Sequence, residues 1–240
     1  MSVTPPDFPW SPAMNAYGFY CIPGTFRKRE VSQILLKGEV NEPRTLSLIQ
    51  QFAGNGDIVS GGAFVGDFLP FMSRTLKRGA YVHSFEPNPT GFAAASMTLA
   101  LNDVRNVKLS PVAVGKEAAV LPLLISTAEG KEMGGSSKIV EEAKEGRTID
   151  VDIVRIDDLV PDSRKVSVLQ LDIEGHEGLA LEGAPQTLAN GHPLVVLETL
   201  ADQDPREIEA KLRELCPAAE YTLMGIMEHN AFYKPFKPRS

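Results

Sequence analysis

From Asp57 onward, the sequence alternates short apolar runs with longer segments of helical pattern, and this alternation constrains the fold more than any other feature. Apolar runs bounded by turns, each followed by a stretch of helical periodicity, are typical of βα units. Such units fold into a twisted parallel sheet with crossover helices. The sequence therefore predicts an α/β protein with a Rossmann-like, mostly parallel sheet.

Local signals place the boundaries of these elements. Strands are expected at 57–64, 81–86, 106–115, 166–172, 193–200, 220–227 and 229–236, and helices at 42–54, 67–79, 89–102, 175–183, 184–191 and 204–215. Asn88 and Pro89 are typical of an N-cap followed by proline at the first helical position. Lys77 and Arg78 before Gly79 are typical of a last helical turn. The two final strands predict a C-terminal antiparallel hairpin.

The length of 240 residues and the absence of a composition break predict one domain. Residues 1–55 are expected to form an irregular cap and a leading helix of this domain, and residues 56–240 its α/β body. A polar segment at about 126–148 interrupts the alternation. We expect it to be an insertion over the active face.

Charge and cysteine content narrow the range of partners. The formal net charge of −7 gives no basic stripe to neutralise phosphates, so nucleic acid is not an expected partner. Cys21 and Cys216 are far apart and form no CxxC or Cys/His pattern, which fits a reducing compartment and argues against structural zinc. No run approaches the ~18 apolar residues of a membrane span. A cytoplasmic protein without a membrane partner is expected, and a homo-oligomer stays open.

The turn after the first parallel strand, SGGAFVGD, is rich in glycine. In an open parallel sheet, ligands bind beyond the carboxyl ends of the strands, where glycine lets a cofactor approach the backbone. Gly62 and Gly66 are expected to make room for a cofactor, and Ala63 and Phe64 lie in the same turn. Taken alone, this pattern fits simple turn geometry equally well.

Glu86 ends the next strand, in SFEPNP, where a carboxylate can accept two hydrogen bonds from a ribose diol. Pro87 and Asn88 follow directly and are expected to share the site. A nicotinamide dinucleotide site would use such an acid as well, but it prefers GxGxxG, which this turn lacks. S-adenosylmethionine has no pyrophosphate to seat on a helix N-terminus, so it tolerates a looser glycine pattern. S-adenosylmethionine is therefore the expected cofactor, in preference to NAD.

The fourth parallel strand ends in LDIEGHE, which brings three candidate catalytic residues together. His176 is the first candidate for a general base, because an imidazole titrates near neutral pH and methylating a hydroxyl requires loss of its proton. Asp172, directly at the strand end, and Glu174 are the second candidates. Glu177 is expected to be a solvated charge on a helix surface.

The same segment raises the question of a metal. Asp172, Glu174 and His176 are residue types that ligate divalent cations. The chain has no His/His pair and no repeated acidic ligand pattern, so no metal is expected. Of the isolated histidines, His83 is expected to pack within its strand and His229 to be exposed.

Taken in order, these motifs resemble those of the FkbM family of S-adenosylmethionine-dependent methyltransferases, over roughly 56–199. GDIVSGGAFVG is similar to the family's first motif and SFEPNP to its second. NDVRNVKLSPVAVG is similar to a third segment, and IDDL, LQLDIEGHEGLALEGA and VVLET to the carboxyl half. LDIEGHE is the most specific block. Several blocks in the right order are much harder to match by chance than one glycine pattern.

The resemblance implies a class I methyltransferase fold with a seven-stranded sheet and helices on both faces. It also implies methyl transfer to a hydroxyl of a small molecule, such as a sugar or a natural product. Carried over by position, Gly62, Gly66 and Glu86 would contact the cofactor, with Asn88 near its adenosine.

By the same resemblance, Asp172 and Glu174 would lie where cofactor and acceptor meet. The chain departs from the family pattern at three positions. The family commonly has Asp at Ser60, Asn at Phe64 and a small residue at His176. Losing the acid at Ser60 and the polar contact at Phe64 suggests an alternative, a catalytically inactive cofactor-binding or scaffold protein. An NAD-dependent oxidoreductase is the second alternative.

Overall fold

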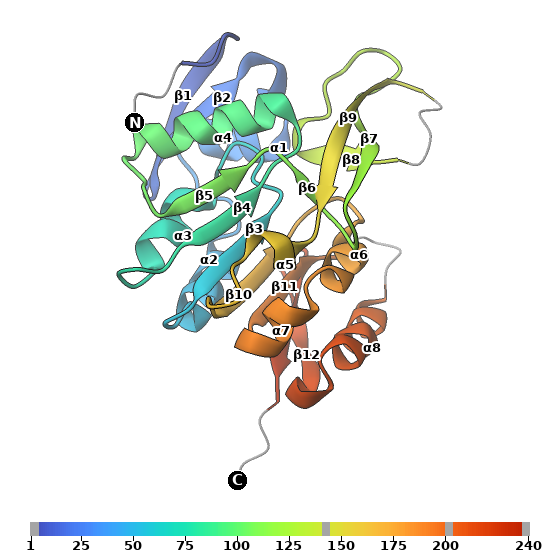
Figure 1. The fold of residues 1–240 in the computed structure, drawn as a ribbon. Helices are drawn as coiled ribbons and strands as arrows, with labels where there is room; N and C mark the ends of the chain where they lie inside the picture. The colour runs from blue at the N-terminus through green and yellow to red at the C-terminus, as the bar shows by residue number, and fades with distance from the viewer. Residues whose placement is uncertain (1–4, 141–144, 200–203, 237–240) are drawn as a thin grey trace.

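The structure, a computed structural model, describes residues 5–140, 145–199 and 204–236. Its centre is a seven-stranded sheet in the order β12-β13-β11-β10-β3-β4-β5 (Figure 1). The strands are β3 (Asp57–Gly61), β4 (Val82–Phe85), β5 (Val107–Ser110), β10 (Val166–Leu171), β11 (Leu194–Glu198), β12 (Tyr221–Met227) and β13 (Asn230–Pro235). Strands β3, β4, β5, β10 and β11 run parallel, and β13 and β12 pair antiparallel at one edge. The predicted parallel sheet with a terminal hairpin is confirmed.

Side chains that alternate along the strands supply two apolar layers. Ile58 and Val168 belong to one buried cluster, and their neighbours Val59 and Leu169 belong to the other, because successive strand residues point to opposite faces. The first layer is covered by α2 (Pro43–Phe52), α3 (Leu69–Thr75) and α4 (Pro89–Leu101), and the second by α5 (Ile156–Leu159), α6 (Glu177–Glu182), α7 (Pro185–Gly191) and α8 (Pro205–Leu215). Helices on both faces are therefore confirmed.

The direction of strand addition reverses at β3. The chain goes from β3 outward to β4 and β5, and then returns to β10 on the other side of β3. Gly61 at the end of β3 is paired with Leu171 at the end of β10, so the two strands end side by side. Ligands of open α/β sheets bind beyond such a reversal. The glycine-rich turn and LDIEGHE thus meet at one edge of the sheet.

The residues before β3 are more regular than the expected irregular cap. They form the antiparallel hairpin β1 (Trp10–Asn15) and β2 (Gly18–Pro23), the 3-10 turn η1 (Gly24–Phe26) and helix α1 (Glu30–Leu36). Tyr20, Ile22 and Phe26 of this region are buried in a cluster with Ala94 of α4. Scattered proline and glycine hid this pattern, because the segment gains its apolar partner only when it packs on α4.

A second sheet, in the order β6-β9-β7-β8, was missed by the sequence analysis (Figure 1). Its strands are β6 (Ala113–Val114), β7 (Ala119–Ser126), β8 (Lys138–Ile139) and β9 (Arg147–Val154). The strand expected at 106–115 is split, because the chain leaves the large sheet after Ser110 and enters the small one at Ala113. The segment expected as an insertion at 126–148 connects β7 to β9. It carries the 3-10 turn η2 (Gly134–Ser136), and its residues 141–144 lie outside the described residues.

Of two further local predictions, the end of α3 is wrong and the burial of His83 is confirmed. Helix α3 ends at Thr75, so Lys77 and Arg78 lie beyond it, because Leu76 already has an extended backbone. His83 is buried in β4, as expected, and its Nε2 lies 2.8 Å from the Oδ2 atom of Asp57. Within the described ranges, none of the helices has the length and apolar character that crossing a bilayer requires.

Candidate functional site

The turn after β3 packs tightly against the backbone that follows β10. The N–H groups of Gly62 and Ala63 both donate to the carbonyl oxygen of Phe85, at 3.2 and 3.1 Å. Gly62 has a φ of 82°, and a Cβ at this position would lie 1.8 Å from the carbonyl oxygen of Asp172. Only glycine fits such a position. The turn therefore holds together the carboxyl ends of β3, β4 and β10.

The remainder of this turn faces other parts of the chain. The ring of Phe64 stacks on Phe26 with ring centroids 5.4 Å apart, and it also borders Gly134 of η2. Gly66 lies against helix α4, since a Cβ there would approach the Cα of Ala95 to 3.3 Å. Phe64 thus connects the turn to the N-terminal region and to η2, while Gly66 lines neither of the two cavities described below.

Glu86 follows β4 and is held by backbone groups. Its Oε2 accepts the N–H of Phe64 at 2.6 Å, and its Oε1 accepts the N–H of Asn88 at 2.9 Å. The residue is only 6% exposed. Burial raises the pKa of Glu86 to about 7, although the two backbone hydrogen bonds act to lower it. The carboxyl is therefore fixed in direction while its remaining lone pairs stay available.

The predicted role of Asn88 as the N-cap of α4 is confirmed. Its Oδ1 accepts the N–H groups of Thr90 and Gly91, at 2.9 and 3.3 Å. Its Nδ2 donates to the Oγ of Ser137 at 3.0 Å. One side chain therefore fixes both the start of α4 and the segment that follows η2.

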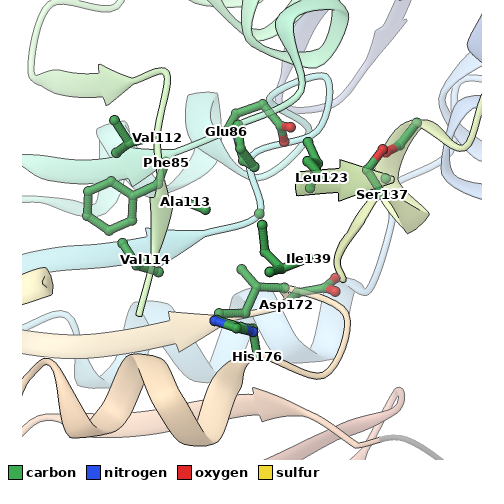
Figure 2. A pocket seen from close by; sticks show the side chains of 15 residues that line it. Phe85, Glu86, Val112, Ala113, Val114, Leu123, Ser137, Ile139, Asp172 and His176 are labelled. Carbon is green, nitrogen blue, oxygen red and sulfur yellow. The ribbon is translucent and has the colours of Figure 1, made fainter. Parts of the chain in front are cut away.

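A narrow apolar cavity, which we call the slot, lies between β4, the small sheet and the loop after β10 (Figure 2). Its volume is about 40 Å³. Apolar side chains from Phe85, Val112, Val114, Leu123 and Ile139 form most of its wall. Glu86, Pro87, Asp172 and His176 also line it.

A larger cavity of about 690 Å³, which we call the chamber, opens on the other side of the same turn. Its wall is formed by the N-terminal region, the turn after β3 and the ends of β10 and β11. Four residues line both cavities, namely Gly62, Glu86, Gly135 and Asp172. Slot and chamber therefore meet at the carboxyl edge of the sheet.

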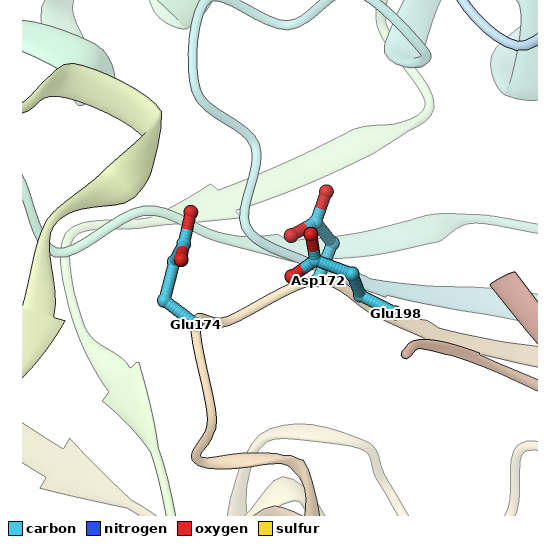
Figure 3. Close-up of side chains that lie close together, drawn as sticks. All are labelled: Asp172, Glu174 and Glu198. Atoms are coloured by element: carbon cyan, nitrogen blue, oxygen red, sulfur yellow. The ribbon is translucent and has the colours of Figure 1, made fainter. Parts of the chain in front are cut away.

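Three carboxyl groups gather in the chamber, from Asp172, Glu174 and Glu198 (Figure 3). One oxygen of each lies within 4.8 Å of the others. Burial and then the charge of Glu198 raise the pKa of Asp172 well above its usual range. The same two causes raise the pKa of Glu174 to about 7. The three oxygens could hold a divalent cation, with Glu198 in the place that the sequence analysis considered for His176.

His176 lies apart from this group. It lines the slot but not the chamber, and its Nε2 is 3.5 Å from where a Cβ of Gly115 would be. Burial lowers the pKa of His176. The imidazole therefore faces the small sheet and the apolar cavity.

Glu177, expected to be a solvated surface charge, is buried at 2% exposure, so that prediction is wrong. Its Oε1 accepts the N–H groups of Ile173 and Gly175, at 2.9 and 3.3 Å. The carboxyl therefore fixes the backbone of the loop between β10 and α6 by hydrogen bonds. Helical periodicity could not indicate this, because the partners are backbone groups of the preceding loop.

Comparison with known proteins shows which family the chain belongs to. The sequence pattern of the methyltransferase FkbM domain matches residues 60–217, more than half of the chain. The chain belongs to the FkbM methyltransferase family. The relative named Methyltransferase 1 from Beauveria bassiana (strain ARSEF 2860) is 26% identical over 152 residues, which are 56% of this chain and 61% of the relative. The crystal structure of methyltransferase FkbM from Methylobacillus flagellatus KT has a TM-score of 0.54 at 17% identity, covering 75% of this chain and 43% of that chain.

The FkbM assignment confirms the family that the ordered motifs indicated, and the structural likeness shows the same fold. The chain spans 61% of the length of the relative from Beauveria bassiana. Within the site, sequence analysis missed Glu198, which ends the strand expected at 193–200. The signal that could have found Glu198 is its place at the carboxyl end of a parallel strand, the same place that identified Asp172.

Proposed function

We propose that this FkbM-family protein is an S-adenosylmethionine-dependent methyltransferase that methylates a hydroxyl group of a small molecule. The observation that carries the proposal is the meeting of an apolar slot and an acidic chamber at Gly62, Glu86 and Asp172. A flat nucleoside and a polar acceptor need different surroundings that adjoin at the reacting atoms. The reversal point of the sheet provides both.

The described residues fit S-adenosylmethionine. The apolar wall of the slot suits an adenine ring, and Glu86 at its end has lone pairs left for ribose hydroxyls. The slot is narrow, with a volume of about 40 Å³. When bound, the cofactor supplies an electrophilic methyl group.

Glu174 is the proton acceptor that the geometry favours. It lines the chamber, and a pKa of about 7 suits a general base near neutral pH. Burial and then the charge of Glu198 raise the pKa of Asp172 well above its usual range, so Asp172 is a poorer proton acceptor near neutral pH. His176, the first candidate from the sequence, borders the slot instead. We therefore assign to Glu174 the role of general base, which accepts the proton that the acceptor hydroxyl loses. Asp172 lines both cavities and would separate the cofactor from the acceptor.

An inactive cofactor-binding scaffold is the second candidate, motivated by Ser60 and Phe64. Both substitutions are accommodated without loss of the turn. The Oγ of Ser60 donates to the Oε1 of Gln170 at 2.7 Å, and the Phe64 N–H still bonds Glu86. An intact turn supports cofactor binding, and turnover is what separates an active enzyme from a scaffold.

Charge supports a small acceptor over nucleic acid. The formal net charge is −7, and the chamber is lined by carboxyl groups that would repel phosphates. We therefore expect an acceptor without phosphate groups.

Cys21 and Cys216 are both free and buried, which supports a reducing, cytoplasmic location.

Calorimetric titration with S-adenosylmethionine, S-adenosylhomocysteine and NAD tests the proposal. We expect the first two to bind, NAD not to bind, and Glu86→Ala to abolish binding. Glu117→Ala is the control, because Glu117 is exposed and lines neither cavity. A folded protein that binds neither of the first two would contradict the proposal. Binding without release of S-adenosylhomocysteine across a panel of hydroxyl acceptors would favour the scaffold.

A further inference from the structure

The loop between β10 and α6 faces both cavities. Asp172 lines the slot and the chamber, Ile173 lines the slot, and Glu174 lines the chamber. Figure 3 shows the carboxyls of Asp172 and Glu174 on the same side of this loop. The proposed cofactor site and the proposed base therefore both depend on the backbone conformation of one short segment.

The backbone of this loop has an unusual conformation. Glu174 has a φ of 56°, in the left-handed region that a residue with a Cβ seldom adopts. Gly175 follows with a φ of 96°, which glycine tolerates. A residue with a side chain stays in the left-handed region only where the surrounding structure holds it there. The loop therefore needs an anchor at Glu174.

Glu177 provides this anchor. Its Oε1 accepts the N–H of Ile173, at 2.9 Å, and the N–H of Gly175, at 3.3 Å. We call these two hydrogen bonds the clamp, because they hold the residues directly before and after Glu174. Glu177 is the first residue of α6 and is 2% exposed, and the same helix is packed into the core through Leu181. The clamp thus ties the loop to a firmly packed helix.

We propose that Glu177 is a positioning residue of the proposed reaction. The clamp keeps Glu174 in the left-handed conformation, which directs its carboxyl into the chamber, and it keeps Ile173 against the slot. Glu177 itself lines neither cavity, so it acts through the loop. Without the clamp, Glu174 would return to the negative φ values that L-residues favour, and the loop would change direction. This inference rests on the proposed methyltransferase function.

The competing explanation is that Glu177 only stabilises the fold. Asp157 offers a matched case, because it is a buried acid whose carboxylate accepts the N–H groups of Gln186 and Thr187, each at 2.9 Å. Asp157 lines neither cavity. Loss of either carboxylate should lower the stability of the protein. Only loss of Glu177 should alter the site.

The test combines calorimetric titration of the full chain with S-adenosylhomocysteine and NMR measurement of amide hydrogen exchange in the free protein. We expect Glu177→Ala to weaken binding about tenfold, the ratio that one charge-assisted hydrogen bond supplies, because a loop that must be ordered on binding lowers the affinity. Exchange at the amides of Ile173 and Gly175 should become faster. Glu177→Gln keeps an accepting oxygen and should retain both the affinity and the slow exchange. Asp157→Ala should leave the affinity unchanged.

Glu177→Asp is a second, milder variant. It keeps the carboxylate but shortens the side chain, so it should lose the clamp and behave like Glu177→Ala, even if the alanine variant does not fold.

Several outcomes would overturn the inference. Unchanged affinity or unchanged amide exchange in Glu177→Asp would show that the clamp does not position the loop. Equal weakening by Asp157→Ala would make the role of Glu177 a purely structural one, and a loss of affinity in Glu177→Gln would assign the effect to charge. Failure of the wild-type chain to bind S-adenosylhomocysteine is a separate result. It would contradict the proposed function, while the exchange rates, measured without ligand, would still decide whether the clamp exists.

Discussion

The slot and the chamber adjoin, but the carboxyl groups that line them have different neighbours. At the slot, Glu86 receives one backbone N–H on each oxygen. In the chamber, Asp172 and Glu174 face Glu198 and each other. Glu86 and Glu174 both have a pKa raised to about 7, from burial alone at Glu86 and from burial together with a neighbouring carboxyl at Glu174. The same pKa therefore arises in two different surroundings, with backbone donors around Glu86 and a neighbouring carboxyl beside Glu174.

The largest effect is expected where the two cavities share a wall. Gly62→Ala places a Cβ 1.8 Å from the carbonyl oxygen of Asp172, at a φ of 82°. The backbone must shift, and we expect a loss of about 4 kcal/mol in the free energy of unfolding, measured by urea denaturation. Gly79→Ala is the matched control, because Gly79 has a φ of 88° but nothing within 4 Å of a Cβ. Similar losses in both variants would show that strain, not the contact between strands, sets the cost.

The pH dependence of stability sharpens the comparison from the side of the slot. The pKa of Glu86 is about 7 in the folded chain and 4.5 in the reference state, so the folded chain holds this proton more tightly. The stabilisation is present below pH 4.5 and is lost as the pH rises through about 7. We expect a loss of about 3 kcal/mol over this range. Glu86→Gln should remove this part of the pH dependence in urea titrations, and an unchanged profile would contradict it.

Glu174→Gln tests the chamber as the place of proton transfer. With an accepted substrate, we expect kcat to fall about 100-fold, because general base catalysis contributes at least this much. The base must be deprotonated, so wild-type kcat should rise as the pH passes through about 7. His176→Ala is the paired variant and should change kcat far less. The reverse order of effects would return the role of base to His176.

The smallest effect is expected at Asn88, which ties the slot to α4. Asn88→Ala removes the cap from Thr90 and Gly91, and should cost about 1 kcal/mol in the free energy of unfolding. Asn88→Asp keeps the cap but loses the donor to Ser137. Thermal unfolding should therefore rank Asn88→Asp above Asn88→Ala. The opposite rank would assign the stability to the contact with Ser137.

Much of the fold follows from local patterns. The parallel strands, the terminal hairpin and the Asn88 cap were predicted because each depends on residues close in sequence. The hairpin before β3 and the small sheet were missed. The hairpin buries Tyr20 and Ile22, and the small sheet buries Leu123 and Ile153. These apolar faces find their partners far along the chain, so a local pattern does not reveal them.

The sequence by itself determined the family and the glycine turn. It also predicted where Glu86, Asp172 and Glu174 lie, because Glu86 directly follows β4 and the other two follow β10. Only the tertiary structure decided which cavity each side chain enters. Glu198 lies near Asp172 because β10 and β11 are neighbouring strands, and His176 lines the slot. Strand order and side-chain direction depend on packing across the sheet, and no local pattern encodes them.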